Sequence, residues 1–193
     1  DYPPETILSH TFYVRKTEEF YRFYRNKMLF PDAKPNKAHL ALAKLEAQGK
    51  LKAVITQNID GLHQAAGSRE VLELHGSVHR NTCQKCGARY TLAQMLTLGD
   101  VPKCPKCGGR VKPDVVLYEE GLDPLTISGA LDAIRRADLL IVAGTSLTVY
   151  PAAAFLDEYP GNRLVLINKT VTPRDDIANR ALQEKLGEVF QNL

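Results

Sequence analysis

The sequence predicts an α/β fold, a Rossmann-like doubly wound parallel sheet that carries a small zinc-binding insertion. Three short apolar runs alternate with stretches of helical periodicity, and strands that alternate with helices are typical of a parallel sheet. All four cysteines lie between positions 83 and 107. At 193 residues the chain is long enough for one domain with an insertion and a substantial core.

Composition narrows the class of protein. With 44% hydrophobic and 24% charged residues the chain resembles an ordinary globular protein. The net charge of +3 comes without a dense run of Lys and Arg, so nucleic acid is not the first partner expected. No apolar run approaches the roughly 20 residues that cross a bilayer, and no signal-peptide pattern precedes the first helix-like segment. We therefore expect a cytoplasmic enzyme or binding domain without a membrane partner.

Two helices are expected before the first strand. Residues 17–30 place aromatic residues and Met28 at helical spacing, which predicts an amphipathic helix that packs an aromatic stripe. Residues 35–50 form the second helix, with Asn36 as N-cap and Gly49 as the C-terminal stop. His39 lies inside this helix and is expected to pack or cap rather than to bind a ligand.

The apolar runs at 51–58, 138–144 and 163–168 suit strands covered on both faces. A helix-like stretch at 123–137 precedes the run at 138–144, and another at 150–159 lies between the two later runs. Ligands of such open sheets bind at the carboxyl ends of the strands, and each run ends in small or polar residues. These are Gln57, Asn58 and Asp60, then 144–146, then Asn168. We expect them to form one rim around a polar ligand of nucleotide size, although any one of them alone fits a helix cap equally well.

The cysteines form two C-x-x-C pairs, Cys83 with Cys86 and Cys104 with Cys107. Four thiolates on two tight turns match tetrahedral zinc, with disulfides or free thiols as the alternative. Glycines follow both pairs and allow the backbone turn that directs both sulfurs to one point: Gly87, Gly108 and Gly109. Because protein sulfur would fill all four positions, the metal is expected to be structural.

His75 ends the apolar run 71–74 and directly precedes Gly76. A lone histidine at a strand end is usually structural. Its position between the amide cluster and the zinc segment instead favours a general base, since an imidazole titrates near neutral pH.

Taken in order, these motifs resemble the sirtuins, the Sir2 family of NAD-dependent protein lysine deacylases, of bacterial type. They read TQNIDGLH, LHG, CQKCG with CPKCGG, VKPDVVLYEE, GTSLTVYP and LVLIN, and they cover nearly the whole chain. The resemblance implies a Rossmann-like NAD-binding domain at 35–76 and 111–193. It also implies a helical module of a smaller domain at 1–34 and a zinc-ribbon insertion at 77–110.

The resemblance further implies how NAD, a consumed co-substrate, is bound. Gln57 would bond the nicotinamide ribose, and the next three residues would line the carboxamide pocket: Asn58, Ile59 and Asp60. The other cofactor residues are expected in the second half of the chain. They are Gly144, Thr145 and Ser146 at the phosphate and ribose, Asn168 and Lys169 at the adenosine ribose, and Lys185 and Leu186 at the adenine.

On the substrate side, an acyl-lysine peptide would add as a strand beside Val116, Leu117 and Tyr118. The Val116 carbonyl would accept the acyl-lysine amide, and Tyr118 and Val149 would pack on its aliphatic stem. The family's common Phe-Gly-Glu pattern reads Tyr118, Glu119, Glu120 here. This departure bears on peptide preference rather than on the chemistry.

The implied reaction is an acyl transfer. The acyl oxygen attacks the ribose carbon as nicotinamide leaves, His75 removes a proton from a ribose hydroxyl, and the acyl group ends on ADP-ribose. Two alternatives stay open at this point. One is a protein ADP-ribosyltransferase that uses the same NAD site. The other is a zinc-ribbon module for nucleic acid, since the insertion is locally basic.

One motif of the family is missing. The family opens with a strand and a glycine-rich GAGxS loop that places helix N-terminal amides against the pyrophosphate, whereas the first glycine of this chain is Gly49. We expect a truncated or incompletely observed version of a longer protein, and the activity of this chain by itself stays open.

Overall fold

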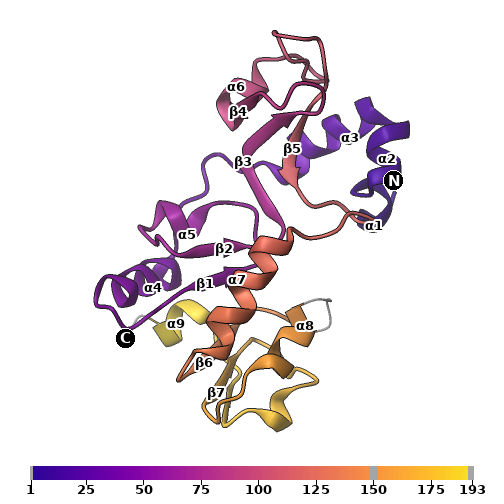
Figure 1. The fold of residues 1–193 in the computed structure, drawn as a ribbon. Helices are drawn as coiled ribbons and strands as arrows, with labels where there is room; N and C mark the ends of the chain where they lie inside the picture. The colour runs from indigo at the N-terminus through magenta and orange to yellow at the C-terminus, as the bar shows by residue number, and fades with distance from the viewer. Residues whose placement is uncertain (1, 148–151, 191–193) are drawn as a thin grey trace. The chain divides into compact units, whose positions relative to one another are not determined.

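The computed structural model describes residues 2–147 and 152–190, which belong to two compact units (Figure 1). Unit 1 comprises Asp1–Ala33, Thr56–Gly61 and Glu73–Asp123. Unit 2 comprises Lys34–Ile55, Leu62–Leu72 and Pro124–Leu193. No helix in the described ranges has both the length and the apolar character needed to cross a membrane.

Unit 1 begins with short helices that carry its aromatic core. They are α1 (Pro4–Ile7), α2 (His10–Arg15), α3 (Thr17–Phe23) and the π-helical turn η1 (Tyr24–Met28). The predicted aromatic stripe is confirmed, because Phe20 and Tyr24 are each 1% exposed and Met28 packs against the same core. Burial of an aromatic side chain of this size contributes roughly 2 kcal/mol to stability. The change from α-helix to π-helix after Phe23 has no counterpart in the sequence pattern.

The rest of unit 1 is an antiparallel sheet around β3 (Gly76–Cys83). Strands β4 (Arg89–Thr91) and β5 (Val111–Val115) pair with its two edges, and α6 (Leu92–Leu96) follows β4 (Figure 1). The aromatic helices pack on this sheet, since the Tyr21 hydroxyl donates to the Val111 carbonyl at 2.6 Å. The register between β3 and β5 shifts between Ser77 and Asn81, so the ladder is interrupted there.

Unit 2 holds the parallel sheet. Its strands are β6 (Leu140–Ala143), β7 (Leu164–Ile167) and β8 (Arg180–Leu182), in that order. Its helical elements are α4 (Lys37–Ala47), α5 (Leu62–Ala65), α7 (Pro124–Arg135), α8 (Ala152–Phe155), η2 (Leu156–Glu158), η3 (Asp175–Ile177) and α9 (Leu186–Phe190).

Helix α4 follows the sequence signals at both ends. The Asn36 side chain accepts from the amides of Ala38 and His39, and the Asn36 amide donates to His39 Nδ1 at 3.1 Å. The expected capping role of His39 is thus confirmed. Gly49 adopts φ +72 just after the helix, as a C-terminal stop requires.

The strand β1 (Val54–Thr56) pairs with β2 (Val71–Glu73) in a separate two-stranded sheet. The Val54 amide donates to the Glu70 carbonyl and the Leu74 amide to the Thr56 carbonyl, so the two strands run parallel. The sequence predicts one sheet for residues 51–58, 138–144 and 163–168. Among the described residues the hydrogen bonds form two sheets instead, because no described strand joins β1 to β6.

Candidate active site and zinc centre

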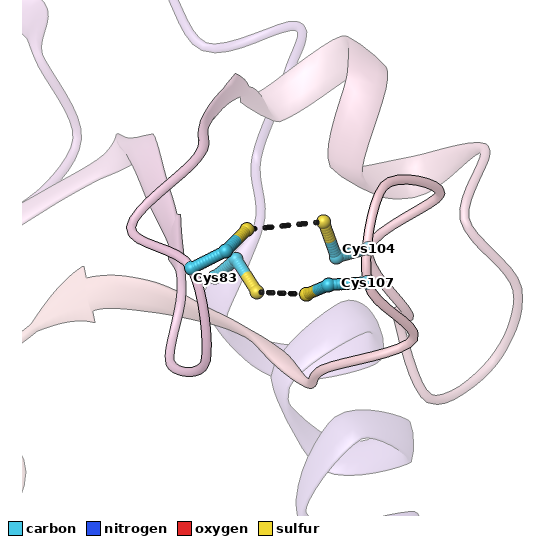
Figure 2. Close-up of side chains that lie close together, drawn as sticks. Cys83, Cys104 and Cys107 are labelled. Carbon is cyan, nitrogen blue, oxygen red and sulfur yellow. Dashed lines mark hydrogen bonds between the residues drawn. The ribbon is translucent and has the colours of Figure 1, made fainter.

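The four cysteines converge on one point. All four sulfurs lie within 4.8 Å of one another, with 3.5 Å between Cys83 and Cys107 and 3.7 Å between Cys86 and Cys104. Figure 2 shows Cys104 and Cys107 projecting from one loop toward Cys83 on the other. A tetrahedron with Zn–S bonds of about 2.3 Å has edges of about 3.8 Å, while a disulfide is about 2.05 Å long. The sulfur set therefore fits a structural zinc ion, and all four thiols are free.

Both zinc-binding turns use the same backbone geometry. In the first, the Cys83 amide donates to the Ala88 carbonyl and the Gly87 amide donates back to Cys83. In the second, the Cys104 amide donates to Gly109 and the Gly108 amide to Cys104. Both turns need a left-handed residue at the same place, and the φ values there are +71 at Gly87 and +70 at Gly108.

Two neighbouring residues, Gly109 and Tyr90, affect the packing and the pKa values of the cysteine sulfurs. A Cβ atom on Gly109 would lie 2.5 Å from the Lys85 Cβ and 2.9 Å from the Cys83 sulfur, so only glycine fits there. The Tyr90 hydroxyl donates to the Cys104 sulfur at 3.0 Å. This hydrogen bond, together with the backbone amides of Lys106 and Cys107 and the Cys86 thiol, outweighs desolvation and lowers the pKa of the Cys104 thiol to about 6, which favours the thiolate that a zinc ion requires.

His75 is held at a fixed orientation in unit 1. Its Nδ1 lies 3.0 Å from the Gln57 carbonyl oxygen, and its own carbonyl accepts from the Val116 amide at 3.0 Å. Because a carbonyl can only accept, Nδ1 carries the proton. The neutral ring therefore presents an unprotonated Nε2, the atom that a general base uses.

The amide cluster lies beside His75 in the same unit. Asn58 is exposed, and its backbone amide donates to the Thr56 hydroxyl at 3.1 Å. The Ile59 carbonyl accepts from the Val78 amide at 3.0 Å, and the Asp60 carbonyl lies 3.0 Å from His79 Nε2. The predicted neighbourhood of residues 57–60 with His75 is therefore present within unit 1.

The later cofactor candidates share one edge of the sheet in unit 2. Ala143 is level with Ile167, and Ile167 with Leu182, so the carboxyl ends of all three strands meet. Gly144 follows β6 at φ +66, where a Cβ atom would lie 3.0 Å from Leu186 Cδ1. Asn168 follows β7 and donates from its side chain to the Thr170 carbonyl at 3.1 Å.

The remaining candidates of this edge differ in exposure. The Thr145 hydroxyl accepts from the Leu147 amide at 3.2 Å, while Ser146 and Lys169 are exposed. Lys185 is exposed and pairs with Glu188 at 3.2 Å. Gly144 is exposed at the end of β6, the part of an open α/β sheet where ligands bind.

Residues 116–118, beside which a substrate peptide is expected to add, have most of their backbone groups in hydrogen bonds. Tyr118 exchanges hydrogen bonds with the Leu8 carbonyl and the His10 amide, at 3.0 and 2.9 Å. Leu117 bonds to Glu120 through both its amide and its carbonyl. Within the described residues, the Val116 carbonyl has no such partner. The side chains of this extended segment differ in exposure, because Leu117 is 5% and Tyr118 52% exposed.

Position 119 is where this chain departs from the Phe-Gly-Glu pattern of the family it resembles. Glu119 adopts φ +75, a conformation that favours the glycine found in the common Phe-Gly-Glu motif. Its carboxylate accepts from the Thr11 amide at 2.8 Å, in the first turn of α2. The side chain thus adds a contact that glycine lacks, at the cost of a strained backbone.

Comparison with known proteins identifies the family. A sequence model described as the Sir2 family matches residues 2–151. A relative from Clostridium acetobutylicum, named NAD-dependent protein deacetylase, is 56% identical over 193 residues, which is 100% of this chain and 79% of the relative. The chain belongs to the Sir2 family. A second relative of that name, from Cutibacterium acnes, is 51% identical and matches 98% of this chain and 77% of its own length.

Solved Sir2-family structures have the same fold. One, described as Sir2Tm bound to a propionylated peptide, matches with a TM-score of 0.91 at 40% identity and covers 100% of this chain and 84% of that one. Another, described as Sir2 with p53 peptide and NAD+, has a TM-score of 0.89 at 41% identity and covers 96% and 80%. The sirtuin fold and the four-cysteine cluster predicted from the sequence are thereby confirmed.

The structure places the predicted site residues of this Sir2-family chain in two sets. The first, in unit 1, holds His75, residues 57–60 and residues 116–118; the second, in unit 2, holds the strand-end residues after β6, β7 and β8. Val149 lies outside the described residues. Sequence reasoning gives no role to His79 and none at the metal to Tyr90. Only the tertiary contacts with Asp60 and Cys104 show what these side chains do.

Proposed function

We propose that this chain removes acyl groups from lysine side chains of proteins, with NAD as co-substrate and His75 as general base. The chain is an NAD-dependent protein deacetylase of the Sir2 family, and its four-cysteine cluster is a structural zinc site. The observation that carries the residue-level proposal is the hydrogen bond between His75 Nδ1 and the Gln57 carbonyl.

This hydrogen bond supports a base at Nε2 for two reasons. It fixes the tautomer, so Nε2 can accept a proton from a ribose hydroxyl without any prior proton loss. It also fixes the ring plane relative to residues 57–60, which we assign to the nicotinamide and its ribose. NAD supplies the ribose carbon that receives the acyl oxygen and the nicotinamide that leaves. The chain needs to supply only positioning and a base.

We assign the strand-end residues of unit 2 to the rest of the cofactor. The exposed position of Gly144 at the carboxyl end of β6 supports a phosphate or ribose contact there, with Thr145 and Ser146 beside it. Asn168 and Lys169 would hold the adenosine ribose, and Lys185 and Leu186 would border the adenine. By the same assignment residues 35–76 and 111–193 form the NAD-binding domain, residues 1–34 the helical module and residues 77–110 the zinc insertion.

The Val116 carbonyl is the proposed acceptor for the acyl-lysine amide of the protein substrate. The engaged backbone of Leu117 and Tyr118 supports this choice, because an incoming peptide strand finds its acceptor at Val116. The exposed Tyr118 ring would pack on the aliphatic stem of the lysine, with Val149.

The test is NAD-dependent release of nicotinamide from an acetyl-lysine peptide. His75→Ala and His75→Asn should each lower turnover by roughly 100-fold or more. The Asn variant is the sharper one, since its amide can still donate to the Gln57 carbonyl but offers no base. Zinc content and melting temperature should not change. Wild-type turnover in His75→Asn would refute the assignment, and product mass spectrometry distinguishes acyl-ADP-ribose from ADP-ribosylated protein.

We also propose a cytoplasmic location. Four free thiols around one metal position support it, because oxidising compartments favour disulfides. Recovery of the protein in the membrane or exported fraction of fractionated cells would contradict this location.

A further inference from the structure

The segment 56–60 is bound along its length by the segment 74–79. The Leu74 amide donates to the Thr56 carbonyl, and the Val78 amide to the Ile59 carbonyl. Two more carbonyls of the segment, at Gln57 and Asp60, are met by the rings of His75 and His79 rather than by backbone amides. Two histidines therefore hold the two sides of one short turn.

We propose that His79 is a positioning residue that fixes the turn at residues 58–60, and through it the binding of NAD. The inference rests on the proposed function, which assigns this turn to the nicotinamide. The role proposed for His79 is to hold the turn, not to contact a reactant. Its effect is transmitted through the backbone of Asp60.

Two contacts carry the inference. His79 Nε2 lies 3.0 Å from the Asp60 carbonyl, so Nε2 is the protonated nitrogen of the neutral ring. The same ring covers the next residue, since a Cβ atom at Gly61 would lie 2.7 Å from His79 Cδ2. Gly61 adopts φ +70, a conformation that favours glycine, and a side chain at this position would have to displace the His79 ring. The ring thus holds both residues at the end of the turn.

The local geometry of β3 allows the His79 side chain to bond to the turn at residues 58–60. Residue 79 lies in the part of β3 where the register with β5 shifts, between Ser77 and Asn81. The pairing of β3 with β4 starts only at Arg80. Residues 78 and 79 therefore lie where ladder pairing is interrupted, and Val78 and His79 bond to the turn instead. Interruptions of a strand ladder next to active sites, β-bulges among them, commonly redirect a side chain in this way.

The test uses three substitutions of similar size. His79→Gln keeps a donor at the place of Nε2, His79→Asn moves the donor to the place of Nδ1, and His79→Phe keeps the ring without a donor. We expect Asn and Phe to raise KM for NAD roughly five-fold, the change that the loss of one hydrogen bond produces, and to slow nicotinamide exchange. In His79→Gln, KM for NAD and the rate of nicotinamide exchange should both stay near their wild-type values. KM for the peptide should not change in any of the three variants.

A second readout does not depend on activity. Amide hydrogen exchange of the peptide that covers residues 56–61 should be faster in His79→Asn than in His79→Gln, with zinc content equal in both. Equal exchange and equal KM in all three variants would overturn the inference. So would a matched loss of zinc and melting temperature in Gln and Asn, which indicates a general structural role. A wild-type protein without NAD-dependent turnover would instead refute the proposed function, while the exchange experiment still decides the role of His79.

Discussion

A Cβ atom at Gly76 would lie 1.9 Å from the carbonyl oxygen of Asp114, closer than any side chain can approach a backbone. Gly76 also adopts φ +76 and opens β3 directly after His75. We predict that Gly76→Ala lowers the free energy of unfolding by about 3 kcal/mol or more, because both the clash and the left-handed conformation oppose alanine. Urea titration measures this loss.

Gly49 is the matched control for Gly76. Its φ is +72, almost the same, but a Cβ atom placed there would have no atom within 4 Å. Gly49→Ala should therefore cost only the conformational part, about 1 to 2 kcal/mol. Equal losses in the two variants would show that the contact with Asp114 contributes nothing.

The zinc site depends on Gly109. A side chain there would meet Lys85 and two of the sulfurs, so Gly109→Ala should weaken zinc binding roughly tenfold or more in competition with a chromogenic chelator. Gly121→Ala is the control, since nothing lies within 4 Å of a Cβ atom at that position. Zinc binding that is unchanged in Gly109→Ala would mean that the turn relaxes at little cost.

Two substitutions at position 119 separate backbone strain from the contact with Thr11. Glu119→Gly removes both the strain at φ +75 and the hydrogen bond to the Thr11 amide, so its melting temperature should stay near wild type. Glu119→Ala keeps the strain and loses the bond, so it should melt at a lower temperature. The reverse order of the two variants in a thermal scan would contradict this explanation.

Glu120 predicts a loss of stability in acid. Burial alone raises the pKa of Glu120, but hydrogen bonds from His10 and the Leu117 amide, together with the Lys112 charge, lower this pKa below its ordinary 4.5. A carboxylate with a lowered pKa stabilises the fold above that ordinary value, and this stabilisation is lost as the pH falls through the folded-state pKa. Glu120→Gln should therefore flatten the acid limb of unfolding free energy measured from about pH 3 to pH 7. An unchanged acid limb would exclude a contribution from Glu120.

Sequence patterns are most informative about the fold where the signals are local. Helix α4 begins after Asn36 and ends before Gly49 because both residues act on their own turn of backbone. Strand β8 escapes sequence-based prediction, since residues 180–182 have no apolar run and become a strand only by pairing with β7. The 51–58 run predicts one longer strand, whereas only Val54–Thr56 pairs with a partner.

In the site, too, residues with local signals can be predicted from the sequence, whereas residues that act through distant contacts cannot. The cysteine spacing predicts the zinc ligands because each pair lies on a single turn, and the positive φ at Gly87 and Gly108 confirms the role expected of those glycines. His79 could not be found in this way. Its contact with Asp60 depends on a shift in the register of β3, which no local pattern encodes.

Strand β3 connects the proposed general base to the zinc site. It starts at Gly76, next to the proposed base, and ends at Cys83, the first zinc ligand. A metal that never meets a reactant can still govern turnover, because the far end of that strand loses its anchor when the ion is withdrawn. Growth under zinc starvation should then slow deacylation in the cell even where NAD is plentiful.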